Sequence, residues 1–142
     1  MIVLDTNIIS EIMKVAPCEK VMCWVNEQDT NQLFITTITI AEISYGLVKL
    51  PLGKRRSTLE NTFNHIILNI FKYRILSFDE PAAYLFGEIM ARRKKLGRPI
   101  AIPDGQIASI ARANWATIAT RNNRDFIDCG LDVINPFVNE IF

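Results

Sequence analysis

Ile2-Val3-Leu4-Asp5 gives the chain three consecutive apolar residues and then an acid. A short apolar run with an abrupt polar end is typical of a strand that is buried on both faces of a parallel sheet. Similar runs follow at 33–35, 74–78, 116–120 and 132–134. Because stretches with helical spacing separate these runs, the sequence predicts an α/β fold. We expect a three-layer arrangement, with a central, mostly parallel sheet of about five strands flanked by helices.

The segments between these runs contain the expected helices, which cover residues 7–14, 18–28, 39–50, 54–73, 82–96 and 103–114. Thr39 is followed three residues later by Glu42, as in a capping box. Asp104 follows Pro103 where an N-cap is favoured. Each of these two acids therefore has a structural interpretation as well as a functional one.

The length and charge of the chain limit the function classes. With 142 residues it has the length of one domain, which we expect to span 1–142. The formal net charge of +1 argues against a nucleic-acid-binding protein, since such domains are usually basic. However, residues 49–98 carry eleven basic and four acidic groups, a net charge of +7, between two acidic segments. A negative site beside a positive surface is therefore compatible with the near-neutral total.

The N-terminus and the cysteines indicate a cytoplasmic protein without membrane association. The first residues have neither the basic nor the apolar region of a signal peptide, and no apolar run approaches the ~18 residues of a transmembrane helix. The cysteines, Cys18, Cys23 and Cys129, contain no C-x-x-C pair, and we expect reduced thiols. With His65 as the only histidine, the chain has little material for a histidine-based triad or metal site.

Four acids each lie beside an apolar strand or a helix start: Asp5, Glu42, Asp104 and Asp125. Taken singly, each is equally well explained as a cap or a loop acid. Taken together, clustered carboxylates repel one another and favour a bound cation. Oxygen ligands without His or Cys suit Mg²⁺ or Mn²⁺. A metal site of this kind, at the carboxyl ends of parallel strands, indicates phosphate chemistry.

Four segments resemble, in chain order, the successive motifs of PIN-domain ribonucleases, above all the VapC-type toxins with their FitB-like branch: residues 2–10, 39–46, 104–108 and 119–122. The resemblance implies that Asp5, Glu42 and Asp104 form the catalytic triad that binds Mg²⁺ or Mn²⁺. It also implies that Asp125 is the fourth catalytic and metal-binding acid. Some FitB-like members have that acid at the position of Asn122, so two positions are open for it.

The same resemblance implies a set of small polar and basic residues around the substrate: Thr6, Asn7, Thr120, Arg121 and Asn122. It implies a metal-dependent endoribonuclease that hydrolyses RNA phosphodiester bonds as the toxin of a toxin–antitoxin pair. Such toxins are usually homodimers, and they form larger assemblies with a small DNA-binding antitoxin of the VapB or FitA type.

Two alternatives to this interpretation are open. The chain can be a non-catalytic PIN-like module that binds RNA or a partner and keeps the acids as structural caps. The basic clusters at 54–56 and 92–95 can be solvated helix faces that complement helix dipoles, or they can contact RNA phosphates.

Overall fold

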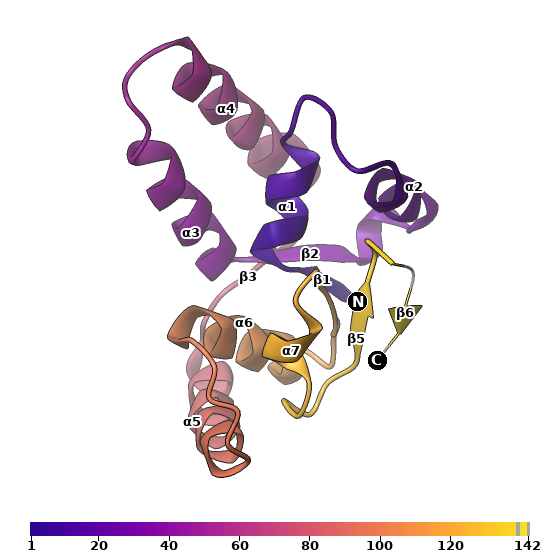
Figure 1. Ribbon diagram of the computed structural model, residues 1–142, viewed down its shortest axis with the longest axis vertical. Coiled ribbons are helices and arrows are strands. Elements are labelled where there is room, and N and C mark those ends of the chain that lie inside the picture. The colour runs from indigo at the N-terminus through magenta and orange to yellow at the C-terminus, as the bar shows by residue number, and fades with distance from the viewer. Residues whose placement is uncertain (139, 142) are drawn as a thin grey trace.

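The computed structural model describes residues 1–138 and 140–141 (Figure 1). In this part of the chain a six-stranded sheet has the order β3-β2-β1-β4-β5-β6. Its strands are β1 (Ile2–Leu4), β2 (Leu33–Thr36), β3 (Ile75–Leu76), β4 (Thr117–Ala119), β5 (Val133–Asn135) and β6 (Glu140–Ile141). The first five are parallel, whereas β6 runs antiparallel to β5. The predicted parallel strands are confirmed, and β6 is an addition at the sheet edge.

The strand β1 lies in the middle of the sheet, between β2 and β4. Val3 and Leu4 are fully buried, as the continuous apolar run predicts. The main-chain N–H of Asp5 donates to the carbonyl of Ala119 at 2.9 Å and extends the pairing of β1 with β4 by one residue. The residues that follow these two parallel strands are therefore neighbours.

Helices cover both faces of the sheet, so the three-layer prediction is confirmed (Figure 1). One apolar core lies between the sheet and the N-terminal helices, and the other lies between the sheet and the C-terminal helices. The first layer holds α1 (Thr6–Ile12), α2 (Glu19–Glu27), α3 (Thr37–Val48) and α4 (Lys54–His65), with a 3₁₀ turn at Thr30–Gln32 and a π turn at Ile66–Ile70. The second holds α5 (Glu80–Lys95), α6 (Ile102–Ala113) and α7 (Asn123–Phe126).

The starts of α3 and α6 correct two predictions about caps. Thr36 is the N-cap of α3 and accepts a hydrogen bond from the N–H of Thr39 at 3.1 Å, so the predicted capping box of Thr39 and Glu42 is wrong. Ala101 is the N-cap of α6, so Asp104 lies within the first turn and does not cap it. Pro103 fits inside that first turn because its missing N–H needs no partner there. The carboxylates of Glu42 and Asp104 are therefore available for another role.

The helices contain two further differences from the sequence prediction. The helix expected over 54–73 ends at His65 and continues only as the π turn. The helix α7 was not predicted, since four residues are too few to show a hydrophobic period. All three cysteines are free thiols, as expected. Within the described residues, no helix has both the length and the apolar character that crossing a membrane requires.

Candidate functional site

A pocket of about 390 Å³ lies where β1 and β4 end. The start of α1, the helices α3 and α6, and the loop after β4 supply its lining: Asp5, Thr6, Asn7, Ser10, Glu11, Lys14, Glu42, Asp104, Arg121 and Asn122. The structure thus brings together all the predicted site residues except Thr120 and Asp125. Thr120 contacts the lining through its hydrogen bond to Asp5, and the charge of Asp125 raises the pKa of Asp104.

The carboxylate of Asp5 is buried and firmly oriented. Its Oδ1 accepts a hydrogen bond from the N–H of Thr6 at 2.7 Å. Its Oδ2 accepts one from the Thr120 hydroxyl at 2.7 Å and one from the Asn7 amide at 2.9 Å. Burial raises the pKa of Asp5 to about 7, although the hydrogen bonds from Thr120 and Thr6 lower it. The charges of Asp104 and Glu42 add to the rise. Asp5 is therefore a firmly oriented carboxylate whose charged form is disfavoured by burial.

Glu42 reaches the pocket from α3 and is held there by the first residue of α1. The Thr6 hydroxyl donates to Glu42 Oε1 at 2.7 Å, and its oxygen lies 3.1 Å from the hydroxyl oxygen of Thr39. Thr39 is fully buried and also lies 3.3 Å from the Thr36 hydroxyl. These hydroxyl groups join the two helices that carry Asp5 and Glu42.

Asp104 and Asp125 belong to the C-terminal helices α6 and α7. Burial raises the pKa of Asp104 to about 6, and the negative charges of Asp125 and Glu42 contribute further. Asp125 is thus close enough to act on Asp104, although it does not line the pocket. Asn122, the other position open for the fourth ligand, lines the pocket as the N-cap of α7, and its N–H donates to Thr120 Oγ1 at 3.0 Å.

Two basic side chains, Arg121 and Lys14, form one wall of the pocket, and only Arg121 was predicted from the sequence. Glu11 is buried and pairs with Lys14 at 2.6 Å and with Arg121 at 3.4 Å, while it accepts the N–H of Cys18 at 2.8 Å. The hydrogen bond from Lys14 is the main reason why the pKa of Glu11 lies below its usual range. Arg121 also lies over the Phe137 ring, 3.9 Å from its centroid. The i,i+3 spacing of Glu11 and Lys14 was the available sequence signal.

The donor set of the pocket fits a hard divalent cation. Within the described residues, no three His, Cys, Asp or Glu side chains already converge closely enough to hold one metal ion. Mg²⁺ does not require such a cage, because it keeps several waters and commonly takes one or two protein carboxylates. Burial is the main cause of the raised pKa values of Asp5 and Asp104, and the charges of the neighbouring acids add to it; a cation would offset both effects.

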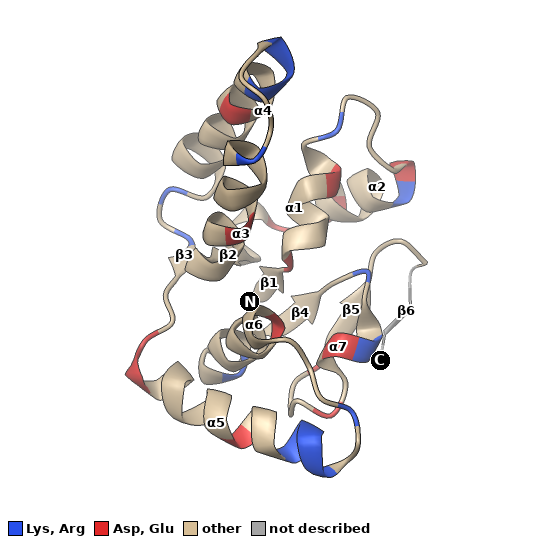
Figure 2. Cartoon of the chain, turned by 60° about the vertical axis from the view of Figure 1, so that its left-hand side comes forward, with Lys and Arg blue, Asp and Glu red and all other residues tan. Residues whose placement is uncertain are grey.

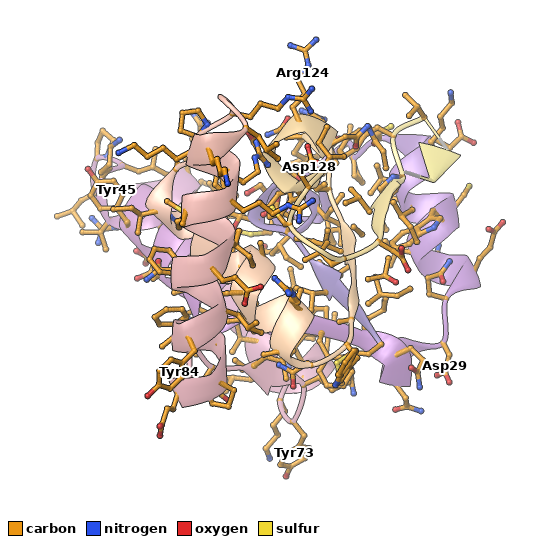
Figure 3. All side chains as sticks on the ribbon, turned by 90° about the horizontal axis from the view of Figure 1, so that it is seen from below. Asp29, Tyr45, Tyr73, Tyr84, Arg124 and Asp128 are labelled. Carbon is orange, nitrogen blue, oxygen red and sulfur yellow. The ribbon has the colours of Figure 1, made fainter. Side chains whose placement is uncertain are left out.

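The basic clusters of the middle segment do not form one surface around this pocket. In Figure 2 the blue start of α4 and the blue end of α5 lie at opposite ends of the molecule. Arg56 is paired with Glu60 at 2.6 Å, and Arg93 is only 3% exposed. Arg124 points away from the body of the protein (Figure 3). Arg121 and Lys14 supply positive charge inside the pocket itself, and Lys54 and Arg55 line a neighbouring groove that shares Lys14.

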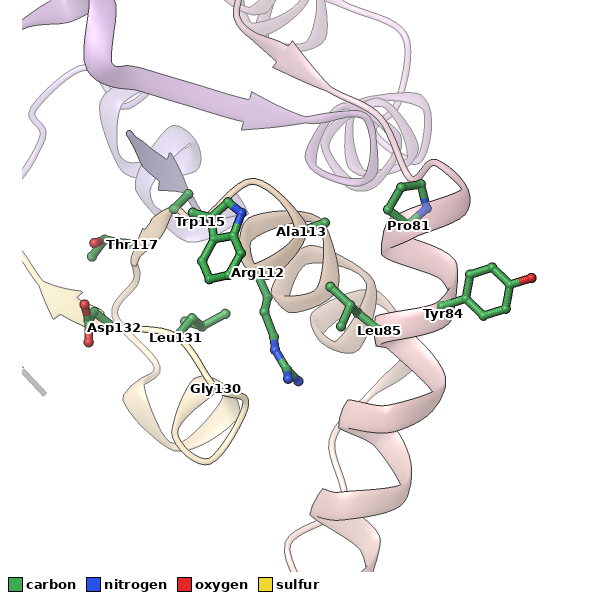
Figure 4. Close-up of a pocket in the computed structure, with 11 residues that line it drawn as sticks. Pro81, Tyr84, Leu85, Arg112, Ala113, Trp115, Thr117, Gly130, Leu131 and Asp132 are labelled. Atoms are coloured by element: carbon green, nitrogen blue, oxygen red, sulfur yellow. The ribbon is translucent and has the colours of Figure 1, made fainter.

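A larger cavity of about 740 Å³ lies at the opposite edge of the sheet, between α5 and the loops before β4 and β5 (Figure 4). Tyr84, Leu85, Trp115 and Leu131 give it apolar walls, and Asp132 is the one acid in its lining. Without a second carboxylate it offers no multi-ligand site for a divalent cation. The chemistry of the chain is therefore expected at the smaller, acidic pocket.

Comparisons with known proteins show the family and the fold of the chain. Residues 2–130 match the PIN domain family. The "VapC ribonuclease Y4jK" of Sinorhizobium fredii is 40% identical over 96% of this chain and 98% of its own length. The "Toxin FitB" of Neisseria gonorrhoeae is 37% identical over 96% and 99%, respectively. A solved structure of FitAB bound to an IR36 DNA fragment superposes with a TM-score of 0.90 at 37% identity, and the match covers 96% of both chains.

Proposed function

From the premise that this chain belongs to the PIN-domain family, we propose that it is a Mg²⁺- or Mn²⁺-dependent endoribonuclease, the toxin of a toxin–antitoxin pair. The observation that carries the proposal is the pocket that collects Asp5, Glu42 and Asp104 beside Arg121 and Lys14. Carboxylates next to cations suit a phosphodiester, since the acids bind a metal ion and the cations bind phosphate oxygens.

In this proposal Asp5 and Asp104 hold the cation, with Glu42 and Asp125 as the further acids of the site. A bound Mg²⁺ or Mn²⁺ lowers the pKa of water and offsets charge on the phosphate group that is attacked. Thr6 and Thr120 keep the carboxylates of Glu42 and Asp5 in place by hydrogen bonds of 2.7 Å each.

The basic wall of the pocket suits the RNA backbone. Arg121 and Lys14 share the Glu11 carboxylate. Their side chains are nevertheless exposed, at 50% for Arg121 and 56% for Lys14. Their remaining donors are therefore accessible to phosphate oxygens. Asn7 binds the N–H of Arg121 at 3.1 Å and thereby fixes the loop that carries it.

The test compares RNA cleavage by the purified wild-type chain and its variants. Cleavage with Mn²⁺ should stop in EDTA and leave 5′-phosphate ends. Asp5→Asn and Asp104→Asn should each slow it by about 100-fold, because each removes a metal ligand. Asp29→Asn is the matched control, since Asp29 is exposed and outside the pocket. Full activity of either pocket variant, with unchanged circular dichroism, would contradict the assignment.

One observation favours the alternative of a non-catalytic RNA- or partner-binding module, namely that no three metal-binding side chains already converge in the described part of the chain. Calorimetric titration of the partner-free protein with Mn²⁺ separates the two functions. Saturable binding that Asp5→Asn removes supports the nuclease, whereas the absence of binding supports the module.

We also propose that an antitoxin of the FitA type inhibits the chain by lying across the acidic pocket. A neighbouring groove of about 520 Å³ shares Lys14 with this pocket and has an apolar floor from Met13, Val15 and Leu59, beside Lys54 and Arg55. A segment that carries apolar and acidic residues for the groove and a basic residue for the pocket matches both surfaces. A peptide with this pattern should compete with RNA for the wild-type chain.

The proposed assembly is a homodimer that forms larger complexes with the antitoxin. Tyr45 on α3 and Tyr84 on α5 are 67% and 76% exposed, and both project from the same side of the molecule (Figure 3). Exposed aromatic side chains of this kind favour contact with a partner surface. A second copy of the chain is the occupant proposed for this face.

A further inference from the structure

Arg93 differs from its neighbours in the basic run that ends α5. Arg92, Lys94 and Lys95 are exposed, whereas Arg93 is buried. Among the acidic side chains that the structure describes, none is paired with Arg93. A buried guanidinium without a counter-ion is costly unless hydrogen bonds satisfy its donors.

The donors of Arg93 go to main-chain carbonyls instead. Nε donates to the carbonyl of Arg98 at 2.7 Å. Nη1 donates to the carbonyls of Asp125 at 3.0 Å and Ile127 at 2.8 Å, and Nη2 donates to that of Arg124 at 2.8 Å. The planar guanidinium thus fixes the backbone before, at and after Asp125.

The turn that Arg93 holds is short, and it is also supported by apolar packing, since Phe126 and Cys129 are fully buried in the second core. The helix α7 has only four residues, and Asp128 just beyond it has a positive φ of 64°. A helix this short does not form without tertiary contacts. The side chain of Arg98 adds one exposed ion pair to Asp128, at 3.1 Å, and such pairs contribute little. Arg93 is therefore the main polar anchor of this turn in the described part of the chain.

We propose that Arg93 is a positioning residue, whose guanidinium fixes the turn of residues 124–129 so that the Asp125 carboxylate faces Asp104 at the acidic pocket. The inference rests on the proposed metal-dependent function with Asp125 as its fourth acid. The influence of Asp125 on the carboxyl group of Asp104 is consistent with this placement. Arg93 itself touches neither metal nor RNA.

The substitution that tests this role is Arg93→Lys, which keeps the positive charge and most of the aliphatic stem. An ammonium group has three donors on a single nitrogen and no planar fork, so it cannot bind all four carbonyls, those of Arg98, Arg124, Asp125 and Ile127, as the guanidinium does. Arg92→Lys is the matched control, since Arg92 is the exposed neighbour on the same turn.

The experiment is a double-mutant cycle in Mn²⁺ affinity, measured by calorimetry on the wild type, Arg93→Lys, Asp125→Asn and the double variant. Each single substitution should weaken Mn²⁺ binding by about 10-fold, and the double variant should be no weaker than Asp125→Asn alone. Arg92→Lys should bind as the wild type does. Wild-type affinity in a folded Arg93→Lys, or losses that multiply in the double variant, would overturn the proposal.

A second measurement needs no substitution and decides the matter if Arg93→Lys does not fold. In ¹⁵N NMR spectra of the wild-type chain, saturating Mg²⁺ should shift the Arg93 Nε signal and leave that of Arg92 unchanged. A static Arg93 signal, while pocket amides shift, would overturn the positioning role but leave the proposed function intact. If the wild type binds no divalent cation at all, both proposals fail together.

Discussion

Asp5 combines the end of a strand, a hydrogen-bond network and a buried carboxylate. The carboxylate is 5% exposed, and three donors orient it. Burial raises the pKa of this carboxyl group by more than the hydrogen bonds lower it. Folding the metal-free chain at neutral pH therefore means burying a charge at a cost.

This cost predicts a pH dependence of stability without metal. The pKa of Asp5 rises on folding from 3.8 to about 7, so Asp5 favours folding fully below about pH 4, and this contribution is lost as the pH rises through 7. In EDTA, the urea midpoint of the wild type should fall between about pH 5 and about pH 8. Asp5→Asn should flatten this dependence, and the exposed control Asp29→Asn should not.

Glu11 has the opposite pH behaviour, since its pKa lies below the usual range. Its contribution to stability is present above the ordinary glutamate pKa and is lost as the pH falls through the lower folded value. Glu11→Gln removes the pairs with Lys14 and Arg121 and should lower the free energy of unfolding by about 1 kcal/mol at neutral pH. The same comparison near pH 3 should show a smaller difference; an equal loss at both pH values would refute the ionic role.

At the scale of elements, the boundaries of the helices decide which acids are available to the site. Thr36 ends β2 with φ −112° and ψ 159° and caps α3 directly, so the chain passes from strand to helix without a loop. This early start places Glu42 inside the helix, facing Thr6. The sequence suggested Thr39 as the cap, because a Thr-x-x-Glu pattern occurs there as well.

The cap assignment predicts a difference between two adjacent threonines. Thr36→Ala removes the hydrogen bond to the N–H of Thr39 and should lower the free energy of unfolding by about 1–2 kcal/mol. Thr37→Ala is the control, because Thr37 is the first residue inside α3 and is only partly buried. Chemical denaturation of both variants measures the difference, and equal losses would contradict the assignment.

On the scale of the whole molecule, the net charge of the basic segment 49–98 does not correspond to one continuous basic surface. The acids of the N- and C-terminal segments meet at one pocket, but the two basic clusters of the middle segment lie at opposite ends (Figure 2). Within that pocket, Arg121 and Lys14 add positive charge beside the acids. A chain with near-zero net charge can therefore still bind a polyanion locally.

The proposed self-association belongs to this scale. Tyr45→Asp places a charge on the exposed face of α3 and should convert the dimer to a monomer in light scattering, because a charge at the centre of an apolar interface is desolvated without a partner. Tyr73→Asp is the control, since Tyr73 is 85% exposed and points in another direction (Figure 3). A wild type that is already monomeric at micromolar concentration would rule out the dimer.

The sequence by itself determined the alternation of strands and helices and the four candidate acids. Apolar runs such as Ile2-Val3-Leu4 define buried parallel strands through local periodicity alone, and Asp5 at the end of β1 followed from them. Only the tertiary structure decided how residues far apart in the chain meet. The pairing of Glu11 with Arg121, the exclusion of Thr39 and Asp104 as caps, and the burial of Arg93 against α7 all depend on such contacts. The physical reason is that hydrophobic periodicity is local, whereas the hydrogen bonds and charges of this site act between elements that only the folded sheet brings together.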